Sequence, residues 1–581
     1  MSKRPMMNEP DPSKRDPEGI GNFHKTMAHD KKTGLVDKKL FSKLDKITQD
    51  GDDFNDVVQA PGASPLINPQ AGWAREETGP DPRSLTMPPP PDVGSDAAAV
   101  EMTELFWMAL LRDIPFTDFE TNNDVKAATA ELQKLFTAHK TEFRRMDLPL
   151  SGVTPGPGMP PIDKETVNIT AKTIFRSGLP GEEFGPLVSQ FFLNDIAYGT
   201  QIISQKQFPY LAGQNYLRDW AAWLRAQDTG LDEDGNNYPS DNTNATPTQA
   251  NPSPTNYYDS GYHSVAGLKP ITTMRHLARF VNKDALHQAY FNAAIQLTNW
   301  RAGQADGNTY TDMTKIKKQI PFGTLGAPHL LSLVSEVADR ALKVVWRQKW
   351  RQYLRHRPEA YAGLMEAARN GLKTKLPAFV FDTVIAKRML NGFDKHNNLL
   401  LPMAFSAGSP AHPAYGAGHA CVAGACVTIL KAWFRTEDAK TGKRVLFKDV
   451  FANAKDPTFG TPLAVQPMGS TDADAMTLEG ELNKLASNVA MGRSMGGVHW
   501  RTDNTRSLRL GEKVATIILR RQSGDYQEKP KWAYRNFDGN LVRIGNDGTV
   551  TVAADKMLEG VYNSPAFAPL PKYEVFDDVI A

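Results

Sequence analysis

Cysteine is almost absent from this chain, which has two among 581 residues. Cys421 and Cys426 lie five positions apart in a segment that we expect to be helical, where their side chains diverge. A disulfide between them is not expected, and a cysteine-based zinc site needs more ligands than the chain has. The sequence therefore excludes a disulfide scaffold and a cysteine-based zinc protein.

Net charge and long apolar runs are also scarce. The formal net charge is only +2, so neither nucleic acid nor a membrane surface is expected as a partner. No run approaches the roughly 18 apolar residues of a membrane helix, and no apolar stretch follows the basic residues near the start. We therefore expect no membrane span and no signal peptide, and take the cytoplasm as the default location.

What the chain does have is helical periodicity. Hydrophobic residues make up 40% of it and recur at three- and four-residue spacing. The expected helices cover residues 101–112, 123–140, 181–195, 217–226, 271–301, 325–356, 359–371, 379–391, 418–435, 478–491 and 499–522. The pattern predicts an all-α fold of helical bundles.

Composition divides the chain into three regions. Residues 1–100 are charged or proline-rich and are interpreted as an extended arm. Residues 101–530 form the helical domain, with a polar surface insertion at about 228–260. Turn dipeptides between β-branched residues predict a small hairpin and tail over residues 531–581.

Basic residues and histidines gather in three short segments of the C-terminal half. These are Lys349 with Arg357 eight positions later, Ala417-Gly418-His419 before an apolar run, and Arg493 with His499 six positions later. They supply two guanidinium groups, an ammonium group, two imidazoles and a backbone N–H at a predicted helix start. Such a set fits a tetrahedral oxyanion.

Single residues of this set also have simpler interpretations. Lys349 could lie on the solvated face of a basic helix, and a lone histidine is more often a core or cap residue than a catalyst. Asp503, four positions after His499, could cap a helix or orient the imidazole. These alternatives stay open.

The order and spacing of the three segments resemble the vanadium-dependent haloperoxidases, most closely the bromoperoxidases of red algae and cyanobacteria. The similarity extends from about residue 65 to about residue 518. It implies a vanadate cofactor and oxidation of bromide, or of iodide or chloride, by hydrogen peroxide. The hypohalous acid formed would halogenate a diffusible organic acceptor.

The resemblance also assigns roles. His499 would bond the vanadium, and the groups around vanadate would be Lys349, Arg357, Ala417, Gly418 and Arg493. His419 would be the acid/base and Lys349 would polarise the peroxide. His412 matches a second histidine of the family pattern, although it could be a plain loop residue before Pro413.

Two positions depart from the family pattern. Ala417 stands where the family usually has serine, and a lost hydrogen bond to a charged group costs about 1.5–3 kcal/mol, so weaker vanadate binding is expected. Gln348 stands where related enzymes place arginine or tryptophan in the surroundings of the halide, which leaves the halide preference open.

Assembly and calcium are further expectations. The resemblance implies a homo-oligomer, either a dimer or a larger assembly of dimers. Independently, the arm residues Leu66, Trp73, Leu85 and Met87 need a partner surface. A structural calcium ion is the weaker expectation, since the oxygen donors Asp306, Asn308 and Asp312 also suit a plain surface turn.

Two other functions remain possible. A phosphatase of the same fold would use His499 as its nucleophile, although its signature has shorter spacings than the eight positions from Lys349 to Arg357 and the 74 from His419 to Arg493. A non-catalytic oxyanion-binding assembly protein is the second alternative, motivated by Ala417.

Overall fold

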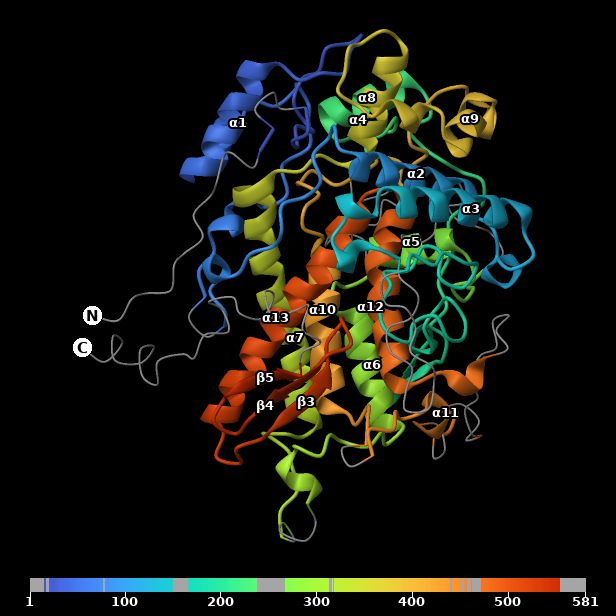
Figure 1. Cartoon of the computed structure of the whole chain (residues 1–581). Coiled ribbons are helices and arrows are strands. Elements are labelled where there is room, and N and C mark those ends of the chain that lie inside the picture. The colour runs from blue at the N-terminus through green and yellow to red at the C-terminus, as the bar shows by residue number, and fades with distance from the viewer. Residues whose placement is uncertain are drawn as a thin grey trace.

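Helices dominate the structure, which is a computed structural model (Figure 1). It describes residues 15–16, 20–76, 79–149, 166–237, 267–312, 316, 318–438, 441–450, 454–456, 461 and 472–553. The α-helices are α1 (Lys38–Asp50), α2 (Asp96–Leu111), α3 (Asn123–Ala138), α4 (Trp220–Thr229), α5 (Met274–Lys283), α6 (Gln288–Asn299), α7 (Ala327–Arg347), α8 (Pro358–Arg369), α9 (Val384–Leu390), α10 (Gly418–Trp433), α11 (Phe447–Val450), α12 (Leu478–Met495) and α13 (Arg501–Asp525). The strands are β1 (Ile196–Tyr198), β2 (Gln201–Ile203), β3 (Trp532–Arg535), β4 (Leu541–Ile544) and β5 (Val550–Ala553).

Helix α10 is the centre of the bundle and packs against α7, α12 and α13 (Figure 1). All of its residues except His419 are buried. A Cβ on Gly424 would lie 1.9 Å from the carbonyl oxygen of Leu508, and a Cβ on Gly511 would lie 1.9 Å from that of Cys421. Glycine at both positions therefore lets α10 and α13 pack backbone to backbone, which fixes the start of α10 relative to α13.

The prediction of a mainly helical fold is confirmed, but three expected helices are wrong in detail. Residues 379–391 form a 3-10 turn, Ala378–Phe381, followed by the separate helix α9. Residues 181–195 contain only the short 3-10 turn Gln190–Phe192, because Gly181 and Gly185 adopt positive φ angles of 78° and 75° and Pro186 follows. Residues 271–301 form two helices, since α5 ends before Asp284 and α6 begins at Gln288.

Two small sheets correct the all-α prediction. Strands β1 and β2 pair as an antiparallel hairpin in a region where no strand was expected. At the other end of the chain, β3, β4 and β5 form a three-stranded antiparallel sheet, lying in front of the bundle in Figure 1. The predicted C-terminal hairpin is thus β3–β4, and a third strand extends it.

The arm is also more ordered than expected, because it folds onto its own chain. Asp37 caps α1, accepting from the N–H groups of Lys39 and Leu40 at 2.7 and 3.2 Å. The apolar face of α1 joins a cluster of Phe23, Met27, Leu44, Trp350 and Leu354, with Leu66 and Trp73 packed against it. Leu85 and Met87 join the main core. The argument that these residues need another subunit is therefore wrong.

The remaining predictions concern the polar insertion, the C-terminal tail and the lack of a membrane span. Most of the predicted insertion at 228–260, and the tail after β5, lie outside the described residues. In the part of the chain that the structure describes, no helix has the length and apolar character needed to cross a bilayer.

Candidate oxyanion-binding active site

The structure brings the three predicted segments together at the N-terminal end of α10. The Arg357 guanidinium donates from Nη1 to Nε2 of His499 at 3.1 Å. Arg357, Lys349, Arg493 and His419 all depress the pKa of His499, after burial as the largest cause. Four residues from sequence positions 349 to 493 therefore act on one imidazole.

Backbone geometry explains how the first segment turns inward. Helix α7 continues into a π-helical turn, Gln348–Tyr353, which ends at Leu354 with a left-handed backbone. Arg357 precedes Pro358 and is extended (φ −83°, ψ 157°), as expected before proline. Lys349 and Arg357 are buried, so the solvated-face interpretation of Lys349 is wrong.

Hydrogen bonds define the tautomer of His499. Arginine only donates, so Nε2 of His499 must accept from Arg357. The proton then resides on Nδ1, which donates to Oδ2 of Asp503 at 2.9 Å. Burial and the nearby cations hold the pKa of His499 well below its usual value. The imidazole is thus neutral, with the lone pair of Nε2 directed into the cation cluster.

Asp503 fulfils both of its proposed roles. Its Oδ2 also accepts from the backbone N–H of Trp500 at 3.0 Å in the first turn of α13. Its Oδ1 accepts from Nη1 of Arg355 at 2.7 Å, and Arg355 donates in turn to Glu101 at 2.9 Å. The sequence analysis missed Arg355, because nothing in its basic run marks one arginine from another.

His419 has a carboxylate partner that the sequence analysis also missed. Its Nε2 lies 2.9 Å from Oδ1 of Asp284, the residue that ends α5. The His419 side chain is 18% exposed and that of Asp284 is 2% exposed. In the described part of the chain, Oδ2 of Asp284 has no hydrogen-bond partner. A partly accessible imidazole oriented by a buried carboxylate suits proton transfer.

His412 belongs to the site rather than to a surface loop. Nη2 of Arg357 lies 2.9 Å from its Nδ1, and Nε of Arg357 donates to its carbonyl oxygen at 2.9 Å. The ring of Trp346 lies 5.0 Å from the imidazole. Burial, with Lys349 and Arg357, holds the pKa of His412 well below its usual value.

The remaining donors come from helix ends. Ala417 is the N-cap of α10 with an extended backbone (φ −80°, ψ 121°), and no side chain among the described residues caps this helix. Its first N–H groups, beginning with Gly418, are thus offered to an anion. Arg493 lies in the last turn of α12, is buried, and donates to the carbonyl oxygen of Val281 at 2.7 Å.

Comparisons with known proteins point to one family. A family model described as the VCPO second helical-bundle domain matches residues 329–527. The vanadium-dependent bromoperoxidases of Corallina pilulifera and Corallina officinalis are 31% and 30% identical to this chain, each over 93% of both sequences. This chain belongs to the vanadium-dependent bromoperoxidase family. The homohexameric second vanadate-dependent bromoperoxidase of Ascophyllum nodosum superposes with a TM-score of 0.74 at 26% identity, covering 94% of this chain and 88% of that one.

The donor set fits the vanadate of this family. Lys349, Arg357 and Arg493 are buried cations, and burial followed by Arg357 lowers the pKa of Lys349 well below its usual value. Lys349 donates to the carbonyl oxygens of Pro413 and Ala414 at 2.8 and 3.2 Å. Cations crowded in this way are destabilised until an anion joins them. Within the described chain the buried indole nitrogen of Trp346 has no hydrogen-bond partner, which leaves a further donor beside the cluster.

Gln348 does not share this environment. It is buried, and its Nε2 donates to the carbonyl oxygen of Leu85 in the arm at 3.0 Å. In this chain the side chain at position 348 therefore holds the arm against the end of α7.

The structure gives no support to the predicted calcium site. Asp306 forms an ion pair with Arg435 at 2.5 Å, and the Asn308 amide accepts from the N–H of Tyr310 at 3.0 Å. Asp312 ends the 3-10 turn that follows Asn308. Across the described residues, no group of three or more His, Cys, Asp or Glu side chains could hold a metal ion.

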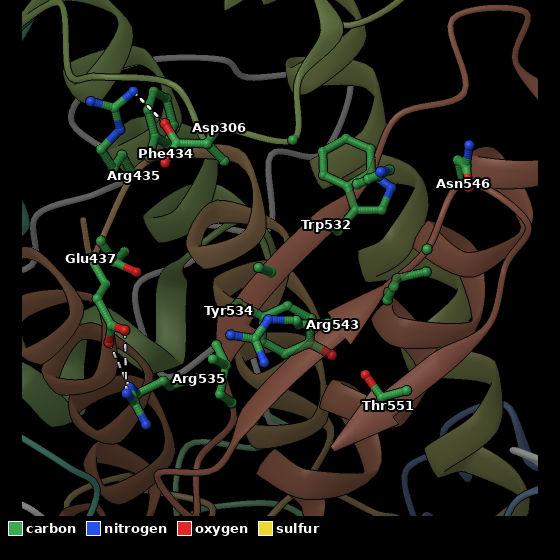
Figure 2. A pocket seen from close by; sticks show the side chains of 18 of the residues that line it. Asp306, Phe434, Arg435, Glu437, Trp532, Tyr534, Arg535, Arg543, Asn546 and Thr551 are labelled. Atoms are coloured by element: carbon green, nitrogen blue, oxygen red, sulfur yellow. Dashed lines mark hydrogen bonds and ion pairs between the residues drawn. The ribbon is translucent and has the colours of Figure 1, made fainter. Parts of the chain in front are cut away.

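A large pocket lies elsewhere, between the C-terminal sheet and the chain after α10 (Figure 2). Its volume is about 540 Å³. It lies at the far end of α10, about 24 Å from Gly418 for a helix of 16 residues at 1.5 Å each. Figure 2 shows Arg435 beside Asp306 and Arg535 beside Glu437, pairs joined at 2.5 and 2.7 Å. Carboxylates already neutralise these two arginines, and none of the three predicted basic segments lines this pocket, so we do not assign it as the oxyanion site.

Proposed function

We propose that this bromoperoxidase-family enzyme binds vanadate at Nε2 of His499 and oxidises bromide with hydrogen peroxide. The observation that carries the proposal is the neutral His499 imidazole, with Nδ1 fixed by Asp503 and Nε2 facing three buried cations. A neutral imidazole nitrogen can bond a metal, whereas an imidazolium cannot.

When bound, vanadate supplies a Lewis acid that activates hydrogen peroxide for attack by a halide. Lys349, Arg357 and Arg493 neutralise the negative charge of the oxyanion, and the N–H of Gly418 donates to it from the start of α10. Because these groups are held by backbone carbonyls and helix ends, they need little reorganisation during the reaction.

Proton transfer is assigned to His419. Asp284 holds Nε2, so the other ring nitrogen, Nδ1, is the one that takes a proton from incoming peroxide and returns it to the leaving oxygen. His412 supports the cluster by contacting Arg357 and is not assigned a proton-transfer step.

Bromide is the proposed halide because the related enzymes are named bromoperoxidases. We assign Gln348 to contact with the arm and not to halide selection, since its Nε2 donates to the carbonyl oxygen of Leu85. The halogenated acceptor is proposed to be diffusible, so that no acceptor-binding site is needed.

A homo-oligomer is also proposed. The Ascophyllum nodosum relative is a homohexamer, and Ile320 and Phe322 of this chain are 84% and 71% exposed, which is unusual for large apolar side chains. Light scattering on the intact protein should show an assembly. A monomer at micromolar concentration would contradict this part of the proposal.

The activity test compares two reactions. Bromination of monochlorodimedone by peroxide and bromide, with and without added vanadate, is measured beside hydrolysis of p-nitrophenyl phosphate. We expect bromination that depends on vanadate and exceeds the phosphatase rate. Phosphate hydrolysis without bromination would favour the phosphatase alternative, and anion binding without either reaction would favour the non-catalytic one.

A further inference from the structure

A proline-rich piece of the arm, residues 85–89, lies against the oxyanion site. We call it the strap. The amide of Gln348 donates to the carbonyl oxygen of Leu85 at 3.0 Å, and the hydroxyl of Tyr353 donates to that of Met87 at 2.5 Å. Both donors come from the π-helical turn that carries Lys349. The strap is therefore bonded on both sides of the site lysine.

The strap also contacts the chain just before the second site segment and helix α13, which follows the third. The hydroxyl of Tyr415 donates to the carbonyl oxygen of Pro88. Ser507 of α13 lies 4.0 Å from the sulfur of Met87 and accepts from the backbone N–H of Ala417 at 2.9 Å. The strap thus contacts the turn that carries Lys349, the residue two positions before Ala417, and the helix that follows His499.

Proline explains why this segment suits such a role. Pro88 and Pro89 have no N–H group, so this part of the strap offers only carbonyl acceptors and has no donor to satisfy. Pro88 and Pro89 each accept from a side chain, and the donor to Pro89 is Nη1 of Arg506. Leu85 and Met87 are only 2% and 4% exposed, so the strap is a buried part of the fold.

The bonded positions lie next to the residues that hold the anion. Gln348 precedes Lys349 directly, and Tyr415 lies two residues before Ala417. We propose that the strap is a positioning element of the vanadate site, which fixes the distance between the Lys349 ammonium and the first N–H groups of α10. This inference rests on the proposed binding of vanadate.

The test is Tyr415→Phe, which removes one hydroxyl and keeps the ring. The matched control is Tyr534→Phe, because Tyr534 is equally buried and shares its hydroxyl with Thr516 of α13 at 2.5 Å, at the C-terminal sheet. Vanadate is titrated into vanadate-free protein by equilibrium dialysis, and the melting temperature of the vanadate-free protein is recorded. We expect Tyr415→Phe to weaken vanadate binding about tenfold, equivalent to about 1.4 kcal/mol. Tyr534→Phe should lower the melting temperature of the vanadate-free protein about as much as Tyr415→Phe does, but it should leave the vanadate affinity unchanged.

Equal vanadate affinity in Tyr415→Phe and the parent protein would overturn the strap proposal. So would an equal loss of affinity in Tyr534→Phe, since that would reflect general destabilisation. If Tyr415→Phe does not fold, Tyr353→Phe gives the same comparison from the other side of the strap. Failure of the parent protein to bind vanadate would instead refute the proposed function, so the two failures are distinguishable.

Discussion

Replacing Ala417 by serine should strengthen vanadate binding. Ala417 is the fully buried N-cap of α10, with the extended backbone that serine adopts when it caps a helix. A serine hydroxyl can accept from a free N–H of the first helical turn and donate to a vanadate oxygen at the same time. The first bond should stabilise the vanadate-free protein by about 1 kcal/mol. The second is made only when the anion is present.

The expected gain in affinity follows from that second bond. A hydrogen bond to a charged group contributes about 1.5–3 kcal/mol, and its lower end applies where the new hydroxyl must fit a fully buried position. About 1.4 kcal/mol corresponds to a tenfold lower dissociation constant. Equilibrium dialysis of vanadate and chemical denaturation measure the two effects separately. Ala417→Gly, which adds space without a hydroxyl, is the control. An unchanged or weaker affinity in a folded Ala417→Ser protein would refute the reasoning.

Three other changes test the site and its support. His499→Ala should abolish bromination even at saturating vanadate, because no side chain would remain to bond the vanadium; full activity in this variant would refute the assignment. The control His396→Ala changes a histidine outside the site and should keep the parent rate. Lys25→Met should lower the free energy of unfolding by about 3–5 kcal/mol, because it leaves the buried Glu359 without its ion-pair partner at 2.8 Å. Adding Glu359→Gln to this variant should restore part of the loss. Additive losses in the double variant would contradict the pairing. Burial lowers the pKa of His356 to about 4, so between pH 6.5 and 4 the unfolded chain binds a proton that the folded chain does not, and its stability falls with falling pH. Denaturation at pH 7 and pH 5 should show a loss from this group of about 2 kcal/mol that His356→Gln lacks, and equal losses in both proteins would sink the argument.

The sequence was informative about the site where the site depends on residues that are close together in the chain. The three site segments were identifiable from residue type and spacing, and Pro358 correctly indicated that Arg357 has an extended, non-helical backbone. The partner carboxylates were not identifiable in the same way. Asp284 is 135 residues from His419 in the sequence. It lies at the break between α5 and α6, and the continuous amphipathic pattern over these residues gave no sign of that break.

The arm shows a different limit of composition. Charged and proline-rich residues cannot form a core alone, and this part of the interpretation holds. However, composition says nothing of surfaces elsewhere in the chain, and the partners of Phe23 and Met27 are Trp350 and Leu354. Helix α1 forms because Asp37 caps it and because Phe41, Leu44 and Ile47 are buried, with Leu44 in the cluster of Trp350 and Leu354. The structure of α1 therefore depends on contacts with residues that are distant in the sequence.

The strap has a consequence for the order in which the protein folds. Leu85 and its partner Gln348 are separated by 263 residues. A ribosome adds about 5–20 residues per second, so the strap waits about 13–53 s for the surface that it covers. During this time Leu85 and Met87 have no native partners, and contacts of such long sequence separation form slowly. This part of the active-site support is thus synthesised early and completed late, and its apolar side chains stay uncovered in the growing chain during the interval.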